Sequence, residues 1–175
     1  MFKAIFNRVK FVLAAALAAV AASCVVIPAA QAQAIGDYGE NQIIDTVFRA
    51  QATSLGANVF VGLSTASCSD GSVGTEVTGG SYARVSVARS LAAWAGTQSA
   101  GSTVASSGTG GVTSNNAVIT FATPSAGWGL VTHAFVADAA TGANILFCQA
   151  LGTSKTINSG DTVSFPAASL TFTIQ

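Results

Sequence analysis

From residue 58 to the C-terminus, the chain consists of short apolar runs separated by stretches rich in Gly, Ser, Asn and Asp. Within YARVSV (82–87) and LTFTI (170–174), apolar and polar residues alternate with the period of two that is typical of a half-buried β-strand. The predicted strands are 58–64, 82–87, 118–121, 129–137, 145–151, 155–157, 163–165 and 170–174. Short strands at this spacing predict an all-β fold, a two-layer antiparallel β-sandwich with a jelly-roll-like arrangement.

One helix is predicted in front of the strands. Residues 40–52 place Ile43, Ile44, Val47 and Phe48 on one helical face. The helix is short and needs tertiary packing for stability, so we expect this face to cover an edge or an open end of the sheets. The predicted core consists of Val59, Val61, Leu63, Val85, Ile119, Phe121, Val131, Phe135, Leu146, Phe147, Phe165, Leu170 and Phe172.

The N-terminal 34 residues have a different character. Three basic residues precede an apolar, Ala-rich run over 11–27, and small residues follow over 29–34. This order is typical of a secretory signal peptide cleaved after Ala32 or Ala34, while an uncleaved hydrophobic arm or membrane anchor is the alternative. The chain therefore divides into a hydrophobic leader, 1–34, and a β-sandwich domain, 35–175, in which the Gly- and Ser-rich stretch 96–116 is an exposed loop or arm.

The charge of the predicted domain argues against nucleic acid as a partner. Beyond the leader, four basic and seven acidic side chains leave a net charge of −3. No basic stripe is present to bind phosphates. A surface with so few charges is common where copies of a protein bury it against one another, so we expect a homo-oligomer. A membrane would be contacted only through residues 1–34.

Two cysteines lie in the predicted domain. Cys68 belongs to a turn-rich segment, and Cys148 lies within an apolar run. In an exported chain the two can form a disulfide across about 80 residues, which contributes roughly 4–5 kcal/mol in the chain-entropy model. Two separate buried thiols are the alternative, and the sequence leaves both interpretations open.

No constellation of residues predicts catalysis, a cofactor or a metal site. The only histidine, His133, lies within a predicted strand, and no acid is closer in sequence than Asp138. A catalytic triad needs a base oriented by a third group, and a metal needs several ligands at suitable spacing. Asp138 and Asp161 lie in predicted turns, where Asp is favoured because it bonds backbone N–H groups. We therefore predict that the protein is not an enzyme and needs no cofactor.

Four short segments occur in an order that resembles a known family. They are Gly79–Arg84 (GGSYAR), Trp128–His133 (WGLVTH), Asp138–Asn144 (DAATGAN) and Lys155–Asp161 (KTINSGD). The set resembles small phage virion proteins commonly labelled tail-fibre proteins, and the resemblance extends over residues 38–174. It implies a structural virion component without catalysis, located in a tail fibre, a tail tip or a capsid decoration. Other virion proteins are then expected as partners beside further copies of the chain.

Elementary physics gives fold-making roles to the positions shared with that family. Gly79 and Gly80 allow a tight turn into the strand that carries Tyr82 and Arg84. Trp128, followed by Gly129, can cap the core with a large amphipathic ring. Asp138 and Gly142 form one turn, and Gly160 and Asp161 form another.

The leader supports a second hypothesis from a different class. An exported or cell-surface module would use the sandwich for adhesion, with carbohydrate as a candidate ligand. Exposed aromatic rings are the usual platforms for sugars, and Trp94 and Trp128 are the candidates. The predicted location is accordingly the virion, with export through the leader as the alternative.

Overall fold

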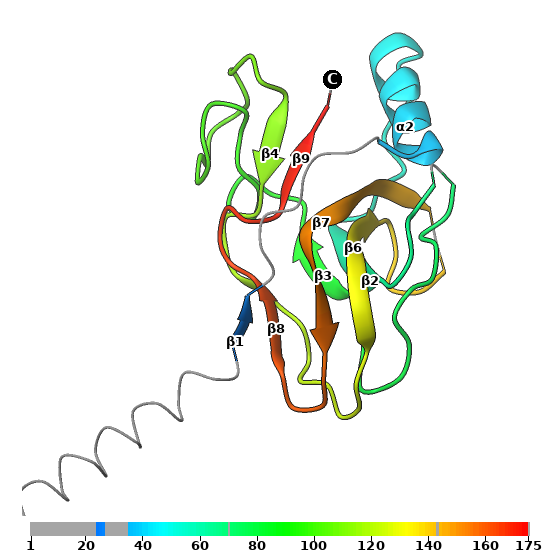
Figure 1. Cartoon of the computed structure of the whole chain (residues 1–175). Coiled ribbons are helices and arrows are strands. Elements are labelled where there is room, and N and C mark those ends of the chain that lie inside the picture. Colours follow the sequence, from blue (N-terminus) through cyan, green and yellow to red (C-terminus); the bar gives the residue numbers. More distant parts are fainter. Residues whose placement is uncertain (1–23, 27–34, 70, 143, 175) are drawn as a thin grey trace, which may run out of the picture.

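The computed structural model describes residues 24–26, 35–69, 71–142 and 144–174. Within these residues, ten elements follow one another, and Figure 1 shows their arrangement. They are β1 (Cys24–Val26), α2 (Asp37–Phe48), β2 (Asn58–Ser64), β3 (Val85–Ala88), β4 (Val112–Ser114), β5 (Ile119–Thr120), β6 (Gly129–Ala137), β7 (Ile145–Ile157), β8 (Thr162–Phe165) and β9 (Thr171–Thr173). The chain is an all-β sandwich with a single short helix in the described part, as the sequence predicts.

The strands form three sheets. The largest has the order β3-β2-β6-β7, with every neighbouring pair antiparallel. The second has the order β1-β8-β5, and β1 pairs with β8 in the parallel direction. The third consists of β4 and β9. In Figure 1, α2 and the C-terminus lie at the same end of the molecule, and β1 lies toward the other end.

Several boundaries differ from the prediction. The segments predicted as strands 145–151 and 155–157 form one strand, β7, because pairing with β6 continues past the Gly-Thr-Ser interruption through a register shift. The Gly- and Ser-rich stretch 96–116 is not entirely a loop, since β4 lies within it and Asn115 is buried at its end. The predicted helix 40–52 begins at Asp37 and ends at Phe48.

The prediction of a leader over residues 1–34 concerns residues outside the described part of the chain, apart from β1. Those three residues add a strand beside β8, with Val25 opposite Val163. Neither the signal peptide nor the hydrophobic arm is tested by this pairing. Both stay predictions.

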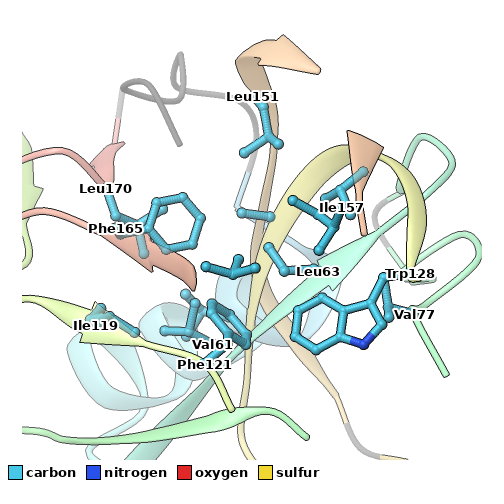
Figure 2. Close-up of a cluster of buried hydrophobic side chains, with 14 of the residues drawn as sticks. Val61, Leu63, Val77, Ile119, Phe121, Trp128, Leu151, Ile157, Phe165 and Leu170 are labelled. Atoms are coloured by element: carbon cyan, nitrogen blue, oxygen red, sulfur yellow. The ribbon is translucent and has the colours of Figure 1, made fainter. Parts of the chain in front are cut away.

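The main core lies between the large sheet and the strands β5, β8 and β9. Figure 2 shows Val61 and Leu63 of β2 at its centre, with Phe165 and Leu170 on one side and Trp128 and Val77 on the other. All the predicted core residues are buried except Val85 and Phe147, which are half-buried. Trp128 is only 5% exposed, so its ring belongs to the core.

A second layer covers the opposite face of the large sheet around Phe135. This ring is fully buried, and Gly62 of the neighbouring strand lies directly beneath it, where even a Cβ atom would come within 2.2 Å of the ring. Cys148 faces Phe135 across the β6–β7 pair. The guanidinium of Arg84 lies 4.9 Å from the centre of the same ring. Cys68 and Glu76, the partners of these two side chains, hold the segment that carries them against this face.

Candidate functional site

The described residues contain no group of three or more His, Cys, Asp and Glu side chains placed to hold a metal ion. His133 is half-buried on β6, and its Nδ1 lies 2.8 Å from the hydroxyl of Thr132. Burial lowers the pKa of the His133 imidazole. A hydroxyl neighbour does not orient the ring as a carboxylate would, so the geometry around this histidine does not assemble a general base.

Among the charged side chains that the structure describes, Arg84 makes the most hydrogen bonds. Its Nε and Nη2 donate to the two carboxylate oxygens of Glu76, both at 2.7 Å, while Nη1 donates to the carbonyls of Ala139 and Gly142. The Arg84 side chain is only 3% exposed, and the two bonds to Glu76 raise its pKa. These bonds join three parts of the chain: Glu76, Arg84 and the turn that contains Ala139 and Gly142. Their chemistry is that of a structural tether.

Tyr82 extends the same network. Its hydroxyl donates to Glu76 and accepts a bond of 2.8 Å from the N–H of Leu63. Desolvation by burial raises the pKa of the Tyr82 phenol well above its usual value. The ring packs edge-on against Trp128, with centroids 5.3 Å apart. Tyr82 therefore connects the tether to the main core.

The remaining predicted turn residues have conformations and hydrogen bonds that shape the backbone. Gly79, Gly80, Gly129, Gly142 and Gly160 have positive φ angles, between 53° and 84°. The indole N–H of Trp128 donates to the carbonyl of Gly80 at 3.0 Å. The carboxylate of Asp138 accepts bonds from the backbone and the side chain of Asn144, and the carboxylate of Asp161 accepts one from the N–H of Asn158.

Cys68 and Cys148 are joined by a disulfide in the structure, with their Cα atoms 6.2 Å apart. The bond attaches the segment 65–77 to β7. The Arg84–Glu76 pair attaches the same segment eight residues further along the chain. Two independent tethers therefore hold one loop against the face of the sheet.

The chain also has an apolar pocket of about 530 Å³ between the large sheet and the β4–β9 pair. It is lined by Leu55, Val59, Arg89, Ser90, Leu91, Trp94, Ala95, Gly96, Ser106, Thr113, Val136, Leu146, Phe147 and Phe172. Trp94 and Phe147 are half-buried, and both rings pack against Phe172, with centroids 6.3 Å and 5.2 Å away. Most of the wall is carbon, and the charged group in the wall is Arg89. A pocket of this size and character fits an apolar occupant.

The helix α2 packs against β7 but turns its apolar face away from the protein. It contacts the rest of the chain through Tyr38, buried Gly39 and Gln42, which lie on the opposite side of the helix. The expected face is exposed: Ile43 by 38%, Ile44 by 47%, Val47 by 66% and Phe48 by 80%. The prediction that this face covers the sheet is wrong, because small and polar residues make the packing contacts.

Sequence reasoning missed three features of these surfaces. Glu76 gave no signal, since its relation to Arg84 depends on how the segment 65–77 folds back. Trp94 and Arg89 line the pocket only because β3, β7 and β9 converge there. Trp128, the other candidate sugar platform, is not among them, because its ring is buried, which agrees with its predicted role as a cap of the core. The orientation of α2 could be suspected from Gly39 alone, a small residue that allows close helix packing.

None of the helices described is long and apolar enough to span a bilayer. No curated protein matches the sequence. A family model does, over residues 34–173: that of the podophage GP4 fiber I protein gp80. The match extends over nearly all of the β-sandwich and the helix in front of it. The chain therefore belongs to the gp80 family of phage fibre proteins, whose members are structural components of the virion.

Proposed function

We propose that this chain is a non-catalytic building block of a phage fibre and that it acts by associating with further copies of itself. The family match supports the fibre role. The chemistry of the described residues agrees with it, because the polar side chains that are most strongly bonded hold turns and loops in place. The proposal places the chain in the virion as part of a tail fibre or tail tip, rather than as a capsid decoration.

The observation that carries self-association is the outward face of α2. Four large apolar side chains of one helix are exposed together. Monomeric proteins seldom expose a contiguous apolar patch of this kind unless it is an interaction site. Elsewhere the surface is poor in charge, which also favours burial against another subunit.

The exported carbohydrate-binding module is the second candidate, and Trp94 is the observation that favours it. This half-buried indole lines the pocket. A sugar site, however, needs several polar groups directed at its hydroxyls, whereas the pocket wall is mainly apolar. Trp128 offers no platform, because its ring is in the core. We therefore rank this function below fibre assembly.

Light scattering on the full-length chain tests the proposal. We expect a discrete multiple of the 17.3 kDa chain mass that dissociates on dilution, and we expect the chain among the proteins of purified virions. A particle of one chain mass at every concentration, together with its absence from virions, would contradict it. Specific binding on a glycan array by such a monomer would favour the second candidate instead.

A further inference from the structure

Two apolar surfaces of the chain have no partner within the described residues, and they complement each other. One is the exposed face of α2, formed by Ile43, Ile44, Val47 and Phe48, which we call the α2 face. The other is the pocket around Trp94 and Phe172, which we call the Trp94 pocket. We propose that the α2 face of one copy docks in the Trp94 pocket of the next copy. This inference rests on the proposed function and names the contact through which the copies would associate.

The α2 face has the arrangement expected of a helix that docks in a groove. Its four residues lie at i, i+1, i+4 and i+5, which puts them on one side of the helix. Phe48 projects furthest, with four-fifths of its surface exposed. Helices that dock in grooves present anchors at this spacing. The pocket of about 530 Å³ has room for the Phe48 ring and a neighbouring aliphatic side chain.

Charge also fits. Glu40 lies one turn before Ile44, in the middle of the α2 face, and is exposed. Arg89 lies in the wall of the pocket, where its Nη1 donates to the carbonyls of Leu55 and Gly56. Neither side chain forms an ion pair within the described residues. Docking would bring Glu40 of one copy toward Arg89 of the next, and opposite charges that meet at a contact favour it.

The area involved is adequate for the core of an interface. A side chain of this size has roughly 150–250 Å² of surface, so the exposed fractions amount to roughly 400 Å² of apolar area. The pocket wall would lose a smaller area, giving roughly 550 Å² at the apolar centre of the contact. A polar rim of about the same area around this centre is needed to reach the size of a specific interface.

The contact is heterologous, because a helix meets a pocket instead of its own equivalent. Repetition of such a contact closes into a ring if the rotation between copies allows it, and otherwise continues as a filament. Each copy would use both surfaces, so a variant in either one should prevent growth. An isologous contact, with α2 against α2, would not involve the pocket at all.

Matched substitutions test the two surfaces separately. Phe48→Ser changes the α2 face, and Leu91→Lys places a charge at the mouth of the Trp94 pocket, where Leu91 is 54% exposed. Val118→Ser and Leu130→Lys are controls of similar exposure, 59% and 52%, and neither lines the pocket. We expect the first two to weaken assembly by about a hundredfold or more, as loss of a central anchor does. The controls should assemble as the unmodified chain does.

Cross-linking at a protein concentration high enough to offset the loss of the Phe48 ring gives a second readout. With Cys24 replaced by Ser, Phe48→Cys copies are mixed with Leu91→Cys copies and oxidised. We expect a disulfide-linked dimer in the mixture and none in either variant alone. A dimer of Phe48→Cys with itself would mean helix-against-helix contact and would overturn the proposal.

The outcomes separate this inference from the proposed function. If the unmodified chain assembles while Phe48→Ser and Leu91→Lys leave its mass unchanged and no mixed dimer forms, the docking is refuted and self-association stands. The occupant of the pocket would then be sought among residues 1–34 or among small apolar ligands. If the unmodified chain is a monomer at all concentrations, both proposals fail.

Discussion

Removing the charge of Glu76 should destabilise the fold more than any other single change at a charged side chain among the described residues. In Glu76→Gln, the guanidinium of Arg84 keeps its buried position but loses the carboxylate that accepts two bonds of 2.7 Å. The glutamine oxygen can replace one of these bonds, while its NH₂ group faces another donor. A buried cation with no counter-charge therefore results.

The structure sets the size of the effect. Breaking a buried ion pair by removing one partner costs about 3–5 kcal/mol. The Arg84 side chain is 3% exposed, but that of Glu76 is 22% exposed, so water can approach from one side and the lower end of the range applies. We expect a loss of about 3 kcal/mol in the free energy of unfolding, which corresponds to a fall in Tm of roughly 6–12 °C.

Urea unfolding of a double-mutant cycle measures this loss. The cycle contains Glu76→Gln, Arg84→Met and the double variant, with coupling of about 2 kcal/mol expected between the two sites. The control is Asp45→Asn in the exposed pair with Arg49, whose side chains are 37% and 68% exposed. Such pairs contribute about 0–1 kcal/mol. Equal effects of Glu76→Gln and Asp45→Asn, or strictly additive effects within the cycle, would refute the reasoning.

Burial raises the pKa of Tyr82, so above about pH 10 the unfolded chain loses a proton that the folded chain keeps, and stability falls as pH rises. Tyr82→Phe should show a shallower fall of its urea midpoint between about pH 10 and pH 11.5; an unchanged slope would argue against this. Replacing Cys68 and Cys148 by Ser should cost about 4 kcal/mol, since the bond spans 80 residues. Full alkylation of both cysteines in denaturant without reductant would show that the bond does not form. Gly79 and Gly80 both have positive φ angles, but only at Gly80 would a Cβ meet another atom, 2.6 Å from the carbonyl of Ala126. Gly80→Ala should therefore be about 1–3 kcal/mol less stable than Gly79→Ala in urea unfolding; equal stabilities would contradict the steric argument.

The sequence predicts the regular strands well where alternation and pairing agree. The predicted bounds of β2 and β6 match the structure, because both strands are long and lie in the middle of the large sheet. The prediction fails where pairing with a strand distant in sequence decides whether a segment forms a strand. The residues of β4 lack a clear pattern and form a strand because β9 pairs with them. β7 continues past Gly152 because β6 extends far enough to pair with both parts.

The helix α2 shows a second limit on what can be predicted from the sequence. Periodicity correctly identifies which side of α2 is apolar, but it says nothing about what that side contacts. The usual assumption is that the chain's own core covers it. Here the packing contacts come from Tyr38, Gly39 and Gln42, and the small residue Gly39 is the one local sign of this orientation. The pocket could not be predicted for the same reason, because its walls come from segments far apart in the sequence, between Leu55 and Phe172.

This orientation of α2 separates folding from assembly. Because Phe48 makes little contact with its own chain, replacing it removes little that stabilises the monomer. The tethers that hold the loop 65–77, Arg84–Glu76 and Cys68–Cys148, lie on the far face of the large sheet from the main core. Substitutions there should lower stability without touching the α2 face. A chain built in this way predicts two independent classes of variants, one that unfolds at lower urea concentration and one that folds normally but does not assemble. Variants of Phe48 that lose stability as severely as Glu76→Gln would show instead that the helix is part of the cooperative fold.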